Sequence, residues 1–214
     1  MDLGRQLIDT LDITPPACVA LVGAGGKTTL MLSLYEEGRH RGWHVTAATS
    51  TKVGAAQVAG IDGFLHGGLD GDKLTGASFE AIANSPIGLV IVEADGARSK
   101  VVKAPAAHEP MVPPTATHVV VVIGADALDR VIEDVAHRPM SVAAVCGCGP
   151  YSRLTVQRAA TLLTSDRGGR KGVPPGADFA VAITRIGPRQ QQLAQELSTL
   201  LETSGVRTVQ LALE

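Results

Sequence analysis

The chain has 214 residues, a formal net charge of −2, 45% hydrophobic residues and 19% charged residues. This balance provides enough apolar material for a folded core and argues against an intrinsically disordered protein. Aromatic residues make up only 3% of the chain and lysine and arginine are scattered, so the composition also argues against a nucleic-acid partner.

Cysteine usage and the apolar runs predict the compartment. Cys18, Cys146 and Cys148 form an odd and sparse set that does not make a disulfide framework, which fits a reducing cytoplasm. The N-terminal segment carries acids where a signal peptide carries bases, and the longest apolar runs are too short to span a bilayer. We therefore expect a cytoplasmic protein with no membrane segment and no membrane partner.

Taken in chain order, apolar runs alternate with helix-like segments. Several expected strands are continuously apolar, as is typical of strands covered by helices on both faces. The alternation predicts an α/β protein with a mainly parallel sheet and helices on both faces, in a single domain over residues 1–214. Strands are expected at residues 18–22, 44–48, 89–93, 118–123, 179–184 and 208–211, and helices near residues 3–11, 27–40, 155–164 and from Pro188 to Gly205.

Two stretches between these elements are expected to be irregular. Residues 60–76 are rich in glycine and aspartate, and residues 103–114 contain four prolines. Because proline lacks a backbone N–H and fixes its own φ, the second stretch is expected to be a shaped loop.

The first expected strand leads directly into a glycine-rich run and then a helix. In this context, backbone N–H groups and the helix N-terminus can surround phosphate oxygens, while Lys27 reaches the terminal phosphates and Thr28 holds Mg²⁺. The spacing is a shortened form, Gly-x-x-Gly-Lys-Thr, and a plain strand-to-helix turn is the alternative. The run predicts a P-loop NTPase-like fold that binds Mg²⁺ with ATP or GTP through Gly23, Ala24, Gly25, Gly26, Lys27, Thr28 and Thr29.

Two acids, Glu93 and Asp95, follow the third expected strand. Ligands bind at the carboxyl ends of strands in open α/β sheets, and period-2 alternation places both acids on one side. An acid there typically supports Mg²⁺ opposite the loop threonine. Together with Lys27 they are the expected catalytic residues; the alternative is that polar residues simply end a strand.

Weaker signals lie elsewhere. Residues 49–52, Thr-Ser-Thr-Lys, are expected near the glycine-rich run, either assisting Mg²⁺ or phosphate or capping the next helix. Cys146 and Cys148 could supply two ligands of a metal site, but the sequence offers no second pair of ligands to complete the usual four. A structural role for these cysteines is therefore favoured. Residues 184–187 lack the Asn and Asp with which GTPases read guanine, so the preference between adenine and guanine is not readable.

Several of these motifs occur together in proteins of the YqeC type, accessory proteins of selenium-dependent molybdenum hydroxylases. The chain resembles that family over most of residues 15–187, through runs at residues 22–29, 49–52, 92–97, 103–110, 124–128 and 137–138. Its most distinctive run is Lys-Ala-Pro-x-x-His-Glu-Pro at residues 103–110. The resemblance implies a P-loop protein that acts in maturation of a molybdenum-containing hydroxylase, with that enzyme or its cofactor-loading proteins as partners.

We expect a second site beside the phosphates, because the loop of residues 103–114 follows the strand that ends near Glu93. Histidine and glutamate together exchange protons or bind a metal, and arginine binds anions. The alternative is a solvated loop whose charges pair among themselves. The residues expected in this site are Lys103, His108, Glu109, His137 and Arg138.

Three functions follow from these residues. The first is an NTP-hydrolysing maturation factor, the second an ATP-dependent small-molecule kinase or ligase, and the third a nucleotide-binding regulatory protein without turnover. The sequence names neither the client nor the oligomeric state, and a homodimer is one arrangement compatible with it.

Overall fold

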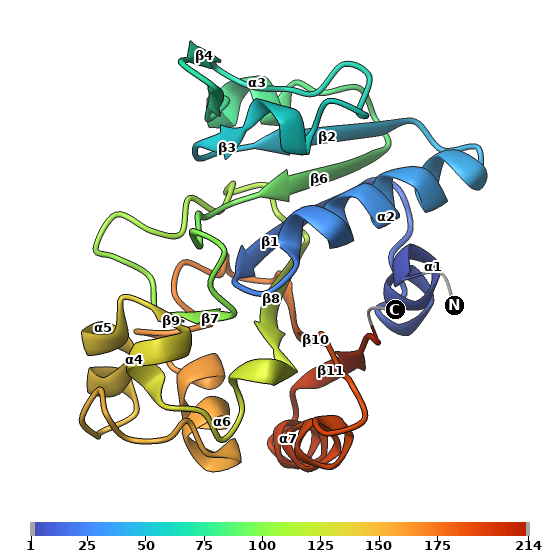
Figure 1. The fold of residues 1–214 in the computed structure, drawn as a ribbon. Helices are drawn as coiled ribbons and strands as arrows, with labels where there is room; N and C mark the ends of the chain where they lie inside the picture. Colours follow the sequence, from blue (N-terminus) through green and yellow to red (C-terminus); the bar gives the residue numbers. More distant parts are fainter. Residues whose placement is uncertain (1–2, 213–214) are drawn as a thin grey trace.

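The computed structural model describes residues 3–212. Its centre is a six-stranded, all-parallel sheet with the strand order β11-β10-β8-β1-β6-β2 (Figure 1). The α/β class and the parallel sheet predicted from the sequence are confirmed. The six strands are β1 (Ala17–Gly23), β2 (Val45–Thr49), β6 (Leu89–Glu93), β8 (His118–Gly124), β10 (Asp178–Thr184) and β11 (Arg207–Gln210).

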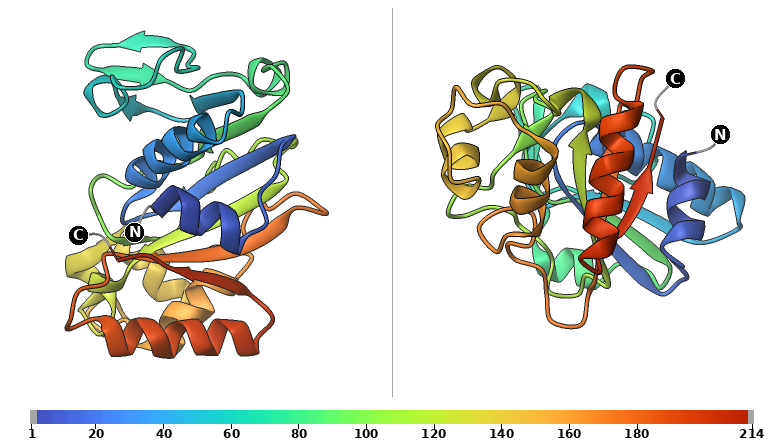
Figure 2. Two further views of the ribbon diagram at one scale, coloured as in Figure 1. Left: turned by 90° about the vertical axis from the view of Figure 1, so that its right-hand side faces the viewer. Right: turned by 90° about the horizontal axis from the view of Figure 1, so that it is seen from below.

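Helices cover both faces of this sheet. In β1, Val19 and Leu21 belong to an apolar cluster with α1 (Leu3–Thr10) and α2 (Lys27–His40). The alternate residues Ala20 and Val22 belong to a second cluster, shared with α6 (Val156–Thr164) and α7 (Gln191–Thr203). Accordingly, α1 and α7 lie on opposite sides of β11 (Figure 2). Burial on both faces explains why the strands are continuously apolar rather than alternating.

The helix boundaries agree closely with the sequence, with one shift. Helix α2 has the expected bounds, and α7 begins at Gln191, so that Pro188 lies in the preceding turn rather than in the first helical turn. Gly42 and Gly205 follow the two helices with φ values of 75° and 76°, which glycine adopts without strain. None of the helices between residues 3 and 212 is long and apolar enough to cross a membrane.

The prediction that residues 60–76 are irregular is wrong. This stretch forms β4 (Gly68–Asp70) and β5 (Lys73–Thr75), which join β3 (Val53–Gly54) in a small antiparallel sheet. The hairpin turns at Gly71, whose φ is 63°. Its short strands carry no alternating apolar pattern, because backbone pairing rather than core burial holds them. The short helices η1 (Ala55–Gln57) and α3 (Phe79–Ala83) flank this sheet.

The connections that leave β6 and β8 also pair with each other, which the sequence did not indicate. Strand β7 (Val102–Lys103) runs parallel to β9 (Ala136–His137), with Lys103 opposite His137. The rest of the stretch up to residue 114 is a loop, as predicted, and we call residues 104–114 the proline loop. The connection after β8 also contains η2 (Ala125–Ala127), α4 (Ile132–Val135) and α5 (Pro139–Val145).

The topology places a ligand crevice at the carboxyl end of β1. This strand has β6 on one side and β8 on the other. After β1 the chain forms β2 at one edge, returns to β6 between β2 and β1, and then continues on the opposite side of β1 with β8, β10 and β11. Such a reversal of strand order leaves a crevice beyond the strand ends, where α/β proteins bind ligands. The turn after β1 and the segments after β6 and β8 meet there.

Candidate functional site

The turn after β1, residues 23–26, requires glycine on conformational grounds. Gly23, Gly25 and Gly26 have φ values of 90°, 98° and 133°, which L-residues rarely adopt. A Cβ atom on Gly25 would lie only 2.5 Å from the backbone nitrogen of Gly124. We call residues 23–26 the glycine loop. Its geometry brings the backbone close to β8 and leaves no side chain at its tip.

Two contacts from neighbouring strands fix the glycine loop. The backbone N–H of Ala24 donates to the carbonyl oxygen of Val122 in β8 at 2.8 Å. The Thr184 hydroxyl, at the end of β10, donates to the carbonyl oxygen of Gly25 at 2.5 Å. Sequence reasoning missed this role of Thr184, because it compared residues 184–187 only with a base-reading motif.

Lys27, the first residue of α2, folds back over the glycine loop. Its ammonium donates to the carbonyl oxygen of Gly23 at 2.7 Å and is only 4% exposed. It also lies 3.2 Å from Oδ1 of Asp95 and 3.8 Å from Oε1 of Glu93. The charge of Lys27 is thus balanced by Glu93 and Asp95, which lie on the same side of the strand end, as the period-2 alternation predicted.

Glu93 ends β6 and contacts the start of α2. The Thr28 hydroxyl donates to Oε2 of Glu93 at 2.9 Å, across the paired strands β1 and β6. From β2, the Thr49 hydroxyl donates to the backbone carbonyl oxygen of Glu93 at 3.2 Å. Burial raises the pKa of Glu93, although the ammonium of Lys27 and the Thr28 hydroxyl act in the opposite direction. The carboxylate is thus held rigidly next to the hydroxyl predicted to bind Mg²⁺.

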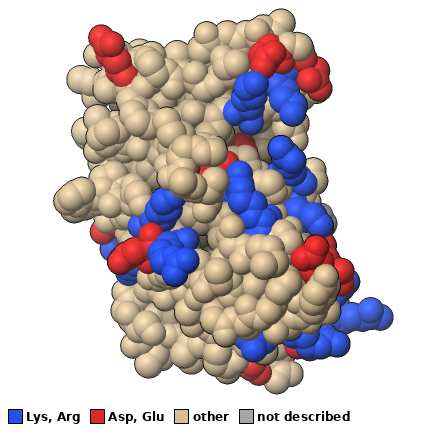
Figure 3. Space-filling model, turned by 90° about the vertical axis from the view of Figure 1, so that its left-hand side faces the viewer, with Lys and Arg blue, Asp and Glu red and all other residues tan. Residues whose placement is uncertain are grey.

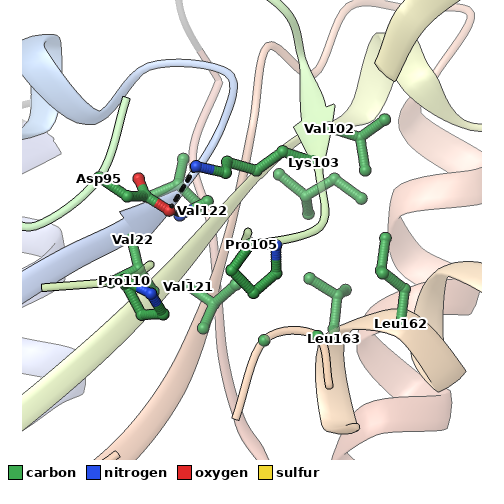
Figure 4. A pocket seen from close by; sticks show the side chains of 14 residues that line it. Val22, Asp95, Val102, Lys103, Pro105, Pro110, Val121, Val122, Leu162 and Leu163 are labelled. Atoms are coloured by element: carbon green, nitrogen blue, oxygen red, sulfur yellow. Dashed lines mark hydrogen bonds and ion pairs between the residues drawn. The ribbon is translucent and has the colours of Figure 1, made fainter. Parts of the chain in front are cut away.

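Asp95 joins the glycine loop to the next segment of the chain. Its Oδ2 atom accepts a hydrogen bond of 3.0 Å from the backbone N–H of Gly23 and lies 3.1 Å from the ammonium of Lys103 (Figure 4). Its Oδ1 atom is buried and accepts no hydrogen bond from residues 3–212, despite the nearby charge of Lys27. Such an unsatisfied acceptor is costly unless a bound water, ion or ligand completes it.

Lys103, Glu109 and Arg138, three residues of the expected second site, form one ion cluster. Glu109 accepts hydrogen bonds from the Lys103 ammonium at 2.9 Å, from Arg138 at 2.7 and 3.1 Å, and from the backbone of Ala106 at 3.3 Å. Burial alone would raise the pKa of Glu109, but the hydrogen bonds from Lys103 and Arg138 lower it to about 2. Because Lys103 touches both Asp95 and Glu109, the second cluster is continuous with the glycine loop.

The two expected histidines have different positions. His137 is half-buried beside Lys103 in the β7–β9 pair, and burial together with the charges of Arg138 and Lys103 lowers its pKa. His108 is exposed, and its side chain makes no hydrogen bond or ion pair within residues 3–212. A turn in which Glu109 N–H bonds to the carbonyl oxygen of Ala106 directs Glu109 inward. The structure therefore does not bring His108 into the cluster.

The weaker sequence signals have structural roles. The Ser50 hydroxyl donates to the carbonyl oxygen of Met111 in the proline loop, and Lys52 pairs with Asp70. Neither residue caps a helix, because a strand follows them. The thiol of Cys146 donates to the carbonyl oxygen of Arg158, and burial raises its pKa to about 11. No group of three potential metal-binding His, Cys, Asp or Glu side chains occurs in the described part of the chain.

The carboxyl-end side of the sheet carries a concentration of cationic side chains. The arrowheads of β1 and β6 point to the left in Figure 1, and Figure 3 shows that side with Lys and Arg across its middle and acidic groups between them. Most of these cations have partners, such as Arg185 with Asp126 at 2.8 Å. Arg98 forms no hydrogen bond or ion pair through its side chain with any described residue. Sequence reasoning missed Arg98, although its position after Gly96 was a signal.

The residues of this site fall within a known family. The model of the YqeC protein family matches residues 19–67 and 64–140, which contain every predicted site residue. This chain belongs to the YqeC family. The protein YqeC of Escherichia coli (strain K12) is 27% identical to it over 237 residues, covering 98% of this chain and 89% of that relative. No solved structure matches the chain significantly. Thr184 lies outside the matched residues.

Proposed function

We propose that this YqeC-family protein binds a Mg²⁺–nucleoside triphosphate at the glycine loop and hydrolyses it, as a P-loop NTPase-like accessory protein. One observation carries the proposal. The loop lysine, Lys27, and the loop threonine, Thr28, are both held by acids that follow the adjacent parallel strand β6. Those are the residue types and positions that phosphate-binding loops use for the terminal phosphates and the metal.

The backbone of the loop supports an anionic ligand. Three of its four residues, Gly23, Gly25 and Gly26, are glycines with positive φ, so they place no side chain in the path of phosphate oxygens. Helix α2, with 14 residues, begins directly after the loop, so its first N–H groups and its partial positive charge face the same space. The topological switch at β1 places this space where α/β proteins bind ligands.

The chemistry of the acids fits a magnesium ion. The Thr28 hydroxyl and the Glu93 carboxylate, which contact each other, supply hard oxygen donors to the metal, directly or through water. Mg²⁺ held there would neutralise charge that develops between the β- and γ-phosphates. The other tasks fall to the chain itself. Lys27 exchanges its contacts with Gly23 and Asp95 for phosphate oxygens, which it can do without moving its backbone.

Asp95 is the residue we assign to the attacking water. Water attacks the terminal phosphorus, the bond from phosphorus to the bridging oxygen of the β-phosphate breaks, and a water proton passes to Asp95 on its way to solvent. The free Oδ1 atom can accept the hydrogen bond that orients this water. The Gly23 N–H and the Lys103 ammonium hold Oδ2, and so fix the direction of Oδ1.

We further propose that hydrolysis serves maturation of a molybdenum-containing hydroxylase. Support for this role comes from the resemblance to accessory proteins of such enzymes, above all in residues 103–110. Lys103 and Glu109 of that run contact each other and, through Asp95, the glycine loop. A client that touches the proline loop would therefore sense the state of the nucleotide site.

A second candidate is an ATP-dependent kinase or ligase, and one cavity favours it. A cavity of about 450 Å³ lies between the proline loop and α5, lined by Pro105, Ala106, Met140, Ser141 and Lys171 among others. That volume suits a small organic substrate. Because Pro105 also borders the cavity beside Asp95, the two spaces adjoin.

Phosphate release from Mg²⁺-ATP and Mg²⁺-GTP tests the proposal. We expect slow turnover by the wild-type protein and at least a hundredfold loss in Lys27→Ala, about 2.7 kcal/mol. Lys52→Ala is the matched control, since Lys52 follows β2 at the same sheet edge but pairs with exposed Asp70. Tight binding without turnover would instead indicate a regulatory protein, and turnover only with an added small molecule a kinase or ligase. No nucleotide binding would refute all three.

A further inference from the structure

The β7–β9 pair has two chemically different faces. Residues paired across neighbouring strands point to the same face, and successive residues point to opposite faces. Val102 and Ala136, which are paired, are buried in the apolar cluster with α6. Lys103 points the other way, to Asp95, as Figure 4 shows. Its pair mate His137 therefore lies on the face that looks toward the glycine loop.

The carboxylates around this face already have hydrogen-bond and ion-pair partners. Glu93 accepts a hydrogen bond from Thr28. Asp95 accepts one from the backbone of Gly23 and forms ion pairs with two lysines. Glu109 accepts hydrogen bonds from Lys103 and Arg138. Three cations, Lys27, Lys103 and Arg138, contact these three carboxylates. A fourth, Arg98, lies in the segment that the Lys100 ammonium joins to the carbonyl oxygen of Asp134. The cation left over is Arg98, whose charge acts on His137 together with those of Arg138 and Lys103.

Two groups near this face have donors that no described residue uses, one on the β9 strand and one on the segment that Lys100 joins to Asp134. The Arg98 side chain and the His137 imidazole make no hydrogen bonds within residues 3–212. Arg98 and Ser99 both adopt left-handed backbone conformations, with φ of 47° and 60°, which non-glycine residues adopt at a cost. Two hydrogen bonds fix the chain immediately after this segment, at Lys100 and Val101. There, Lys100 donates to the carbonyl oxygen of Asp134, and Gly124 donates to that of Val101.

We propose that Arg98, His137 and the outward edge of Arg138 form a subsite for a small oxyanion, separate from the nucleotide and beside its terminal phosphate. The ligand is a free inorganic oxyanion or an oxyanion group on a small molecule. Guanidinium and imidazole groups supply directed donors for such oxygens, and the local excess of positive charge attracts them. The placement beside the phosphate rests on the proposed function, whereas the binding of the anion does not.

Histidine NMR with inorganic sulfate as the probe tests the subsite. An anion bound among these cations favours protonated imidazole, so sulfate should raise the pKa of His137 by at least about 0.5 unit. The charges that act on this imidazole are those of Arg138, Lys103, Glu109 and Arg98. The exposed and unpartnered His108 is the internal control and should not shift. A parallel titration with sodium acetate shows whether a carboxylate shifts the His137 pKa as sulfate does, or whether the subsite selects a tetrahedral oxyanion.

Variants separate the subsite from general salt effects. Arg98→Ala should raise at least tenfold the sulfate concentration that gives half of the His137 pKa shift. Arg189→Ala, which removes another exposed arginine without a side-chain partner, should leave it unchanged. Equal shifts of His108 and His137, or an unaltered response in Arg98→Ala, would overturn the proposal.

A non-hydrolysable triphosphate distinguishes this subsite from the nucleotide site. If the two are separate, saturating triphosphate with Mg²⁺ leaves the sulfate response of His137 in place. If triphosphate abolishes that response, Arg98 and His137 serve the nucleotide's own phosphate and the subsite does not exist. In Lys27→Ala the sulfate response should persist while triphosphate binding fails, so loss of the proposed nucleotide function would not remove the subsite.

Discussion

The glycine loop and the cluster of Lys103, Glu109 and Arg138 lie at the same sheet edge but are built differently. The glycine loop is a contiguous run whose conformation is set by its own glycines. The cluster joins Lys103 of β7, Glu109 of the proline loop and Arg138, which follows β9, so its members lie up to 35 positions apart. The comparison shows that one site can combine a local motif with a long-range assembly.

The two regions also differ in how completely their polar groups are satisfied. In the cluster, both oxygens of Glu109 accept hydrogen bonds. Beside the glycine loop, Oδ1 of Asp95 accepts no hydrogen bond from any residue that the structure describes, and the Lys27 ammonium contacts only this carboxylate, Glu93 and the carbonyl oxygen of Gly23. A satisfied ion cluster stabilises one conformation, whereas unsatisfied groups are poised for a ligand. Three substitutions test this difference.

The largest expected effect concerns the acids beside the glycine loop. Glu93→Gln keeps an oxygen that accepts from the Thr28 hydroxyl but removes the charge that attracts Mg²⁺. We expect Mg²⁺-dependent triphosphate affinity to fall about hundredfold, while metal-free affinity changes little. Asp95→Asn should spare binding and slow turnover instead. Calorimetry with and without Mg²⁺ measures the first effect, and Asp70→Asn, at an exposed ion pair, is the control.

The next effect concerns the stability of the cluster. Glu109→Gln leaves the Lys103 ammonium and Arg138 without their shared carboxylate, and we expect a loss of about 2 kcal/mol at pH 7. The pKa of Glu109 is about 2 in the folded state against 4.5 for a free glutamate. Its stabilising contribution is therefore complete above pH 4.5 and is lost as the pH falls toward 2. Urea unfolding between pH 7 and pH 3 should show the variant and the wild type converging; a constant difference would contradict this cause.

The smallest expected effect concerns the base. The segment after β10 lacks the carboxylate with which GTPases read guanine, and Arg185 there pairs with Asp126 instead. ATP and GTP affinities should therefore differ by less than about tenfold, or about 1.4 kcal/mol. Competition calorimetry measures the ratio. A thousandfold preference for GTP would show that another residue, with Asp126 the first to examine, reads the base.

The features that the sequence predicted are those encoded over short stretches. The six strands, helix α2 and the placement of Glu93 and Asp95 on one side of the strand end all follow from apolar runs, glycine spacing and period-2 alternation. Their contact with Lys27 was not predicted. The features it missed depend on pairing between distant segments. The β7–β9 pair has two residues in each strand, too few for any periodicity, and the small antiparallel sheet carries no apolar pattern. The hydrogen bond from Thr184 to Gly25 joins segments 159 positions apart, so only the folded chain shows it.

The hydrogen bond from Thr184 to Gly25 spans 159 positions of the chain. On a ribosome, the glycine loop leaves the exit tunnel long before the strand that supplies this hydroxyl has been made, and domains generally form their contacts as the chain emerges. The residues of the loop are therefore synthesised long before the residue that restrains them. A nascent chain halted before residue 184 would carry the whole glycine-rich motif and still lack the hydroxyl that donates to Gly25, so this restraint on the loop forms only after β10 has been made.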